Sequence, residues 1–276
     1  MALTVNRRFV VGSGMANLMA YLPANPALAH DHDTLPDSEI AHAGGFTAKL
    51  INPTTRYNHA VLGDAIEASG FSVARGGKRH VFRLKPDAVF EDRRVRLWDV
   101  DGDGVAEAVI VKSYLTSGAA LAVYKLGHNG ITALAESAPI GQRNRWLNPV
   151  GSGDFTGTGE PLIAAVITPH LTGSLRLYRL SGSTLDEVAR VDGYTNHIIG
   201  SRDLDLARVV KGRHGLQIVI PTLDRRALAL LSFKGGSATL LVQKAVSSRI
   251  IGLGIVKEGM APVRLENGER VKISLL

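Results

Sequence analysis

Apolar and polar positions recur along this chain with a period of about fifty-five residues. Three short apolar runs, at 108–112, 162–167 and 217–222, each follow a turn-like segment and precede a second apolar run bounded by Gly, Ser or Asn. Runs of this length, with turn residues on either side, predict β-strands. Further runs follow in each interval, so every repeat predicts about four short strands.

A single four-stranded sheet of this kind cannot bury both of its faces, whereas repeated sheets can cover one another. A solenoid is the competing repeat architecture, but four strands in about fifty residues is the size of a propeller blade. The sequence therefore predicts an all-β fold, a β-propeller of four-stranded blades over residues 46–276. Five blades are expected, starting near 56, 93, 145, 197 and 249, and the short last unit could close the ring by pairing with Phe46–Ile51.

The first 29 residues differ from this pattern. Arg7 and Arg8 precede an apolar stretch of about 14 residues, and 27–29 read ALA, the form of a signal-peptidase site. Because a bilayer span takes about 20 residues, we interpret 1–29 as a signal peptide and 30–45 as a flexible leader. An amphipathic helix docked on the domain is the alternative, and the twin-arginine and general secretory routes both stay open.

Composition narrows the classes of partner. The chain has no cysteine, which excludes disulfides, thiolate metal sites and thiol nucleophiles. Its 32 Lys and Arg residues outnumber 25 Asp and Glu residues, but they are scattered and form no stripe with aromatic residues. We therefore expect no nucleic-acid partner. The mature protein is expected to be a periplasmic or secreted monomer without a transmembrane anchor.

One turn carries a regular series of acidic residues. Carboxylates occupy positions 1, 3, 5 and 9 of the loop, and the glycine at 104 permits a sharp bend. Oxygen ligands at this spacing suit Ca²⁺, with a backbone carbonyl as a further ligand, and strand rather than helix follows. An acidic turn closed by water and backbone hydrogen bonds is the alternative. The predicted calcium ligands are Asp99, Asp101, Asp103, the Val105 carbonyl and Glu107.

The corresponding turns of the next two repeats lose this charge. Asp154, Thr156 and Thr158 keep oxygen atoms, so the second turn is expected to bind a cation far more weakly. Lys211 and Arg213 replace the acids in the third turn, which is expected to bind none. The series predicts one calcium site, in the first turn.

These residues carry a resemblance to a known repeat. Residues Trp98–Val111 read WDVDGDGVAEAVIV and look like an FG-GAP/VCBS repeat, as in integrin α-subunit propellers and secreted bacterial proteins. More narrowly, Arg56–His59, Arg145–Pro149 and Asn196-His197 are similar to segments of uncharacterised proteobacterial VCBS-repeat proteins. The resemblance covers roughly 50–260 and implies a propeller with calcium in the first loop. It implies no reaction, because such proteins include adhesins, lyases and proteins of unknown role.

A second set of residues recurs at one position of the repeat, so its members should lie on one ring. Guanidinium groups suit carboxylate or phosphate, and aromatic rings can stack on a ligand. Ion pairs between blades and core packing of the aromatic residues are the structural alternative. The predicted ligand-binding residues, for an anionic or carbohydrate ligand, are Arg56, Tyr57, Arg145, Trp146, Asn196, His197 and Arg249.

No nucleophile elbow, metalloprotease or Walker motif is present. The sequence favours a ligand-binding or scaffolding protein, or one that binds a protein partner. An enzyme acting on polysaccharides or phosphoesters is the alternative, with His59, Asp64 and His197 as acid–base candidates in a central channel.

Overall fold

The computed structural model describes residues 33–276, so the predicted signal peptide and the first residues of the leader lie outside the described part. Antiparallel hairpins follow one another along the chain, and strand pairing groups them into three sheets, which we divide in chain order into five units for description. The strands are β1 (Ala41–Ala43), β2 (Phe46–Thr54), β3 (Glu67–Arg75) and β4 (Lys78–Arg83); β5 (Ala88–Phe90); β6 (Arg96–Trp98), β7 (Glu107–Tyr114), β8 (Gly118–Gly127) and β9 (Gly130–Glu136); β10 (Leu147–Gly153), β11 (Leu162–Ile167), β12 (Ser174–Ser181) and β13 (Thr184–Val191); β14 (Arg208–Lys211), β15 (Leu216–Pro221), β16 (Ala227–Lys234) and β17 (Ser237–Ala245); and β18 (Ile250–Leu253), β19 (Met260–Leu265) and β20 (Arg270–Ser274).

The prediction of an all-β, propeller-type fold is confirmed. Three units have the expected four-stranded meander, and a 3-10 turn, η2 (Ala60–Leu62), is the helical segment among the described residues. The first three units also join into one 13-stranded sheet through short contacts, β5 between β3 and β7, and a single bridge between Glu136 and Thr184. No helix in residues 33–276 has the length and hydropathy of a membrane span.

Each inner strand is buried on both faces because sheets pack on either side of it. In β7, Ala108 and Ile110 join a cluster with the first unit, whereas Val109 and Val111 join a cluster with the third. Successive side chains of a strand point to opposite faces. The continuous apolar runs in the sequence therefore supply two separate cores at once. The same division holds in β11, where even-numbered and odd-numbered residues from 162 to 167 belong to different clusters.

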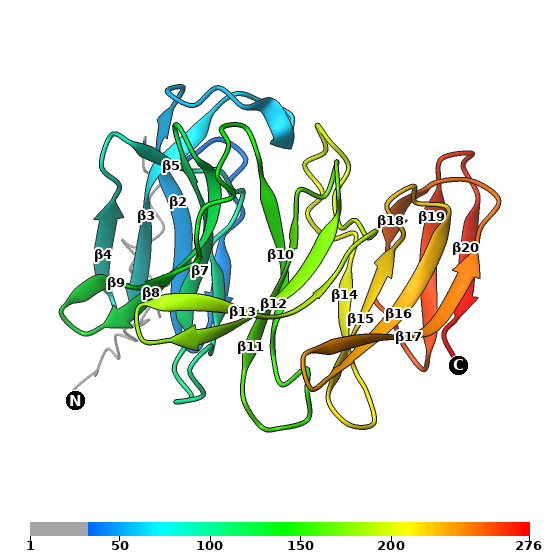
Figure 1. Cartoon of the computed structure of the whole chain (residues 1–276). Helices are drawn as coiled ribbons and strands as arrows, with labels where there is room; N and C mark the ends of the chain where they lie inside the picture. The colour runs from blue at the N-terminus through cyan, green and yellow to red at the C-terminus, as the bar shows by residue number, and fades with distance from the viewer. Residues whose placement is uncertain (1–32) are drawn as a thin grey trace, which may run out of the picture.

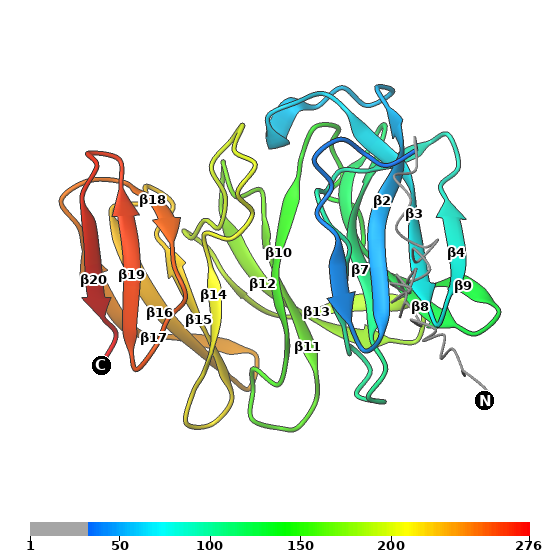
Figure 2. The ribbon, with the colours of Figure 1, turned by 180° about the vertical axis from the view of Figure 1, so that it is seen from behind.

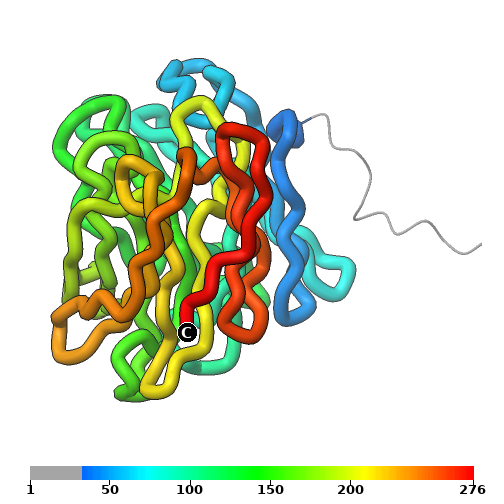
Figure 3. The backbone as a smooth tube through the Cα atoms, turned by 90° about the vertical axis from the view of Figure 1, so that its right-hand side faces the viewer, coloured from blue at the N-terminus to red at the C-terminus, as the bar shows by residue number. Residues whose placement is uncertain are grey.

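Four apolar clusters join each unit to the next, from the first to the fifth. The sheets follow one another from β2 at one end to β20 at the other (Figure 1), and the view from behind shows the same order (Figure 2). Seen from the C-terminal side, the last sheet lies in front of the others (Figure 3). None of the four clusters of described residues joins the fifth unit to the first.

The predicted pairing of Phe46–Ile51 with C-terminal strands is wrong. This segment belongs to β2, which pairs with β1 and β3 inside the first unit, while β20 pairs with β19. The reason is burial: Leu50 faces Phe71 across the β2–β3 pair, and both side chains are fully buried in the core between the first two units. The first unit therefore begins before the expected position near 56.

Candidate functional site

The acidic turn joins β6 to β7 at the lower edge of the stack in Figure 1. Gly102 and Gly104 both have positive φ, at 80° and 84°, which the sharp bend requires. Asp99 caps the turn, since its Oδ1 accepts from the Gly102 amide at 2.7 Å and its Oδ2 from the Gly104 amide at 3.0 Å. The turn is thus held by its own carboxylates and presents their remaining lone pairs together.

Three carboxylates converge in this turn. One oxygen each of Asp99, Asp101 and Glu107 lie within 4.8 Å of one another. Glu107 is fully buried; its Oε2 accepts from the Val100 amide at 3.1 Å, whereas its Oε1 has no hydrogen-bond partner. Burial, with added repulsion from Asp101 and Asp103, raises the pKa of Glu107 to about 7.

The donor set fits a hard divalent cation. A buried carboxylate oxygen without a partner costs free energy that a bound cation would offset. Oxygen ligands alone, from several carboxylates on one flexible turn, are what Ca²⁺ takes. Lys125 supplies one opposing charge, with Nζ 3.4 Å from Asp101 and from Asp103. This single positive charge does not balance the four negative charges that the carboxylates of the turn can carry.

In the second turn, between β10 and β11, the aspartate that corresponds to Asp99 has hydrogen-bond partners on both of its carboxylate oxygens. Both oxygens of Asp154 accept backbone amides, from Thr156, Gly157 and Thr158 on Oδ1 and from Gly159 on Oδ2, at 2.7–3.1 Å. These bonds hold the pKa of Asp154 below its usual value, although burial opposes them. The chain itself therefore satisfies this carboxylate.

The third turn closes without carboxylates. The amide of Gly212 donates to the carbonyl of Gly215 at 2.9 Å, which makes a tight hairpin at the end of β14. Lys211 and Arg213 lie on this hairpin.

The predicted ligand-binding residues lie at the opposite, upper edge of the stack. The segment that enters each unit there bonds to a hairpin turn of the unit before it. The Ala119 amide donates to the Arg145 carbonyl, the Tyr194 amide to the Gly173 carbonyl, and the Ile250 amide to the Arg225 carbonyl, at 2.8–3.0 Å. Segments near 145, 194 and 250 therefore occupy corresponding places in successive units, although their hydrogen bonds do not follow an exact spacing of fifty-two residues.

Tyr57, Trp146 and His197 meet in one buried cluster at this edge. The Tyr57 hydroxyl accepts the Asn144 amide at 2.9 Å, and the Trp146 indole donates to the Glu91 carbonyl at 2.9 Å. The His197 ring packs edge-on against Trp146, with centroids 4.8 Å apart. These aromatic rings are core residues between units and expose almost no surface.

The other four predicted residues make separate contacts. Arg56 donates to the Lys85 and Ala88 carbonyls, and Arg145 to the carbonyl of its neighbour Asn144. Asn196 is buried and donates to the Asn148 carbonyl. Arg249 is half-exposed beside Glu266 in the last unit. The acid–base candidate Asp64 is also apart, since it pairs with Arg202 at 3.3 Å rather than with His59.

A buried carboxylate next to this cluster was missed by sequence reasoning. Glu91 is 1% exposed, and its two oxygens contact His59 Nδ1 at 2.5 Å and the Ser113 hydroxyl. Burial raises the pKa of Glu91 to about 7, against the lowering effect of His59. The only signal was an acidic pair, at 91 and 92, directly after the apolar run of β5.

The hydrogen bonds fix the tautomers of two histidines here. His197 Nε2 lies 2.9 Å from the Ser201 carbonyl, which can only accept, so Nε2 carries the proton. Neutral His197 then accepts at Nδ1 from His170 Nε2, 2.8 Å away. Burial lowers the pKa of both rings to about 4, and both are neutral at pH 7. His170, half-buried and stacked on Trp146, keeps a free lone pair at Nδ1.

No protein-family model and no curated protein matches this chain. Among solved structures, a crystal structure of a proposed 6-phosphogluconolactonase from Bacteroides fragilis is similar over 88% of this chain and 84% of that one. The identity is 10% and the TM-score 0.38, a level of likeness that says nothing about activity. The FG-GAP/VCBS resemblance of the acidic turn therefore stays a prediction.

Proposed function

We propose that the protein is an exported, propeller-type protein that binds one Ca²⁺ in the turn between β6 and β7 and acts as a ligand-binding or scaffolding protein. The observation that supports this most is the second oxygen of Glu107, buried, without a partner, and facing two further carboxylates. The Val105 carbonyl and Asp103 would complete the oxygen set. The ion would stabilise the loop that connects the first two strands of the second unit.

Calcium should raise the thermal stability of the protein. At a hundred times its dissociation constant, a ligand that binds only the folded state stabilises it by about 2.7 kcal/mol. For a domain of this size that corresponds to roughly 5–10 °C in Tm. Glu107→Gln, which keeps the shape of the side chain but removes a charged ligand, should lose most of this calcium-dependent shift.

Differential scanning calorimetry with Ca²⁺ and with chelator tests this directly. Glu160→Gln is the matched control, because Glu160 is an exposed acid that pairs with Arg179 of β12 in the third unit, away from the first turn. An equal calcium-dependent shift in Glu107→Gln and in the control would overturn the proposal. Magnesium in place of calcium should produce a smaller shift, since Mg²⁺ gives up its water reluctantly.

The periplasmic or secreted location rests on residues 1–29 of the sequence. A fusion of these residues to a reporter that functions only after export would test it. Replacing Arg7 and Arg8 with lysine separates the two routes, because the twin-arginine route requires the arginine pair, whereas the general secretory route accepts lysine. Retention of the unmodified fusion in the cytoplasm would contradict the proposed location.

Hydrolysis of polysaccharides or phosphoesters is a second candidate function. The observation that favours it is the contact between His59 and the buried Glu91, which orients the ring and leaves Nε2 free to move a proton. His59→Gln should then abolish turnover of a polysaccharide or phosphoester substrate, while Arg190→Gln on an outer hairpin should not. Turnover that survives in His59→Gln would exclude this site.

A further inference from the structure

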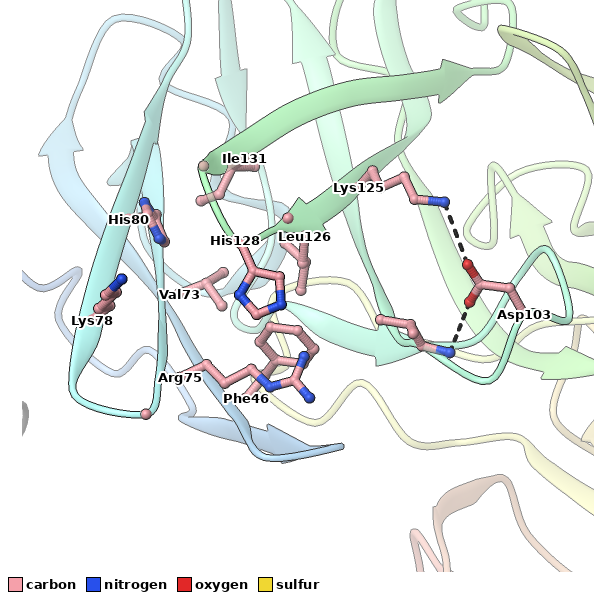
Figure 4. A pocket seen from close by; sticks show the side chains of 14 residues that line it. Phe46, Val73, Arg75, Lys78, His80, Asp103, Lys125, Leu126, His128 and Ile131 are labelled. Atoms are coloured by element: carbon pink, nitrogen blue, oxygen red, sulfur yellow. Dashed lines mark hydrogen bonds and ion pairs between the residues drawn. The ribbon is translucent and has the colours of Figure 1, made fainter.

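A pocket of about 500 Å³ opens between the first two units, next to the acidic turn. Two hairpins, β3–β4 and β8–β9, form its sides, and the first residue of β2 lies at its base (Figure 4). This volume lies in the range of small-molecule sites in proteins. The pocket is separate from the upper edge, where the predicted ligand-binding residues lie.

The pocket joins an apolar floor to a basic rim. Phe46, Val73 and Leu126 make the floor, and each is largely buried in the core between the two units. The rim carries basic side chains from both hairpins, and Asp103 is the acidic residue among the lining residues. The basic side chains are Arg75, Lys78, His80, Lys125 and His128.

Arg75 links the floor to the rim. Its guanidinium carbon lies 4.6 Å from the centre of the Phe46 ring, so this exposed residue places its charge over the apolar surface. Figure 4 shows Lys78 and His80 on the neighbouring strand β4 and His128 on the opposite hairpin. A ligand resting on the floor would therefore meet positive charge from two sides.

We propose that this pocket binds an amphipathic organic anion, with its apolar body on the floor and its carboxylate or sulfate against Arg75 and Lys78. A neutral apolar ligand would leave the basic rim unused, and a small inorganic anion would leave the floor uncovered. Guanidinium and ammonium groups bind such head groups by charge-assisted hydrogen bonds.

Lys125 connects this pocket to the acidic turn. Its ammonium group lies 3.4 Å from both Asp101 and Asp103 and also lines the pocket. This second step rests on the proposed calcium site. When Ca²⁺ takes the two carboxylates, Lys125 is released toward the pocket and the positive charge around the anion grows. Calcium and the anion should thus strengthen each other's binding by the same factor.

The pocket is tested with decyl sulfate, measured by isothermal titration calorimetry with the full mature protein. Saturable one-to-one binding is expected, with no binding of decyltrimethylammonium, which has the same tail, or of methyl sulfate, which has the same head group. The double variant Arg75→Gln/Lys78→Gln should bind decyl sulfate with an affinity at least ten-fold lower than that of the wild type. The matched control, Lys234→Gln/Lys244→Gln, neutralises two exposed lysines of the β16–β17 hairpin.

The proposed anion site is overturned if the cationic amphiphile binds equally well. It is also overturned if Arg75→Gln/Lys78→Gln keeps the affinity of the wild type while circular dichroism shows an intact fold. These measurements use chelator, so they do not depend on calcium. Added Ca²⁺ should then tighten decyl sulfate binding roughly five-fold in the wild type. Lys125→Gln should keep calcium binding and lose most of the tightening.

The two proposals fail in different ways. Absence of calcium binding by the wild type removes the calcium site and the coupling but leaves the pocket. Calcium binding with an unchanged decyl sulfate affinity removes the coupling alone.

Discussion

At the scale of single residues, the first and second hairpin turns differ in how the negative charge of their carboxylates is compensated. In the second turn Asp154 is satisfied by backbone amides, so no ion is needed. In the first, Glu107 lies behind the loop with one oxygen unpaired, and two aspartates face it. The acid at the ninth position, Glu107, therefore distinguishes the proposed calcium site from the second turn, where Leu162 stands at that position. All of these residues lie within nine positions, which is why the sequence alone predicted the loop.

The upper-edge histidines make stability depend on pH. Burial lowers the pKa of His170 and His197 to about 4, from about 6.5 in the unfolded chain. At these two rings the unfolded state therefore binds more protons between these values, and their contribution to stability falls as pH decreases from about 6.5 toward 4. Between pH 7 and 5 His197 should contribute a loss of about 2 kcal/mol, and the half-buried His170 somewhat less.

Urea unfolding of the wild type and of His170→Gln at pH 7 and pH 5 measures this effect. The variant lacks one titrating ring, so its loss of stability on acidification should be clearly smaller. Glu91 and Glu107, whose raised pKa values change stability in the opposite direction over this range, titrate in both proteins and cancel in the comparison. Identical losses in the two proteins would contradict the assigned neutral tautomers.

At the scale of elements, neighbouring units are held together through their turns as well as their cores. Gly157, in the second turn, has φ +76°, and a Cβ there would lie 1.9 Å from the His214 carbonyl of the third turn. The close contact leaves no room for a side chain. This turn thus acts as a joint between the third and fourth units.

Gly157→Ala should destabilise the protein by about 2–4 kcal/mol, because strain at positive φ adds to a clash with backbone. Gly182→Ala is the matched control: its φ is +61°, and nothing lies within 4 Å of the added Cβ. Gly182→Ala should lower the free energy of unfolding by only about 1 kcal/mol. Equal midpoints of thermal unfolding for the two variants would show that the turns do not pack as described.

The sequence predicted strands better than it predicted their partners. Runs such as 108–111 are continuous because two sheets cover them, and that signal is local. Which strand lies beside β2 depends on what covers Leu50, and that information is spread over two units. The cluster of Tyr57, Glu91 and Trp146 likewise draws on three separate segments, so its assembly could not be inferred from spacing alone.

At the scale of the whole molecule, the described residues form a series of sheets with a core between each pair of neighbours. The segment that enters the fourth unit also contacts the first unit and the segment that follows it, since Val61 shares a cluster with Leu204 and Arg94 pairs with Asp205. The fifth unit shares a cluster with the fourth alone, whereas β7 is covered on both sides. In such a repeat architecture stability is nearly a sum of units and their interfaces. The last unit should therefore open most easily.

Val263→Ala, within the last cluster, should accelerate amide hydrogen exchange in β18–β20 and leave β7 protected. Val111→Ala, buried between the second and third units, should instead lower protection in both of those units. Exchange monitored by mass spectrometry distinguishes the two patterns. A uniform change across the chain in both variants would indicate one cooperative structure rather than a series of coupled units.

The central claim is that one acidic turn binds one calcium ion, and a calcium titration by isothermal calorimetry tests it most directly. The wild type and Asp154→Asn should both bind a single Ca²⁺, whereas Glu107→Gln should bind at least ten-fold more weakly. Unchanged binding in Glu107→Gln, or no calcium binding by the folded wild type, would contradict the account.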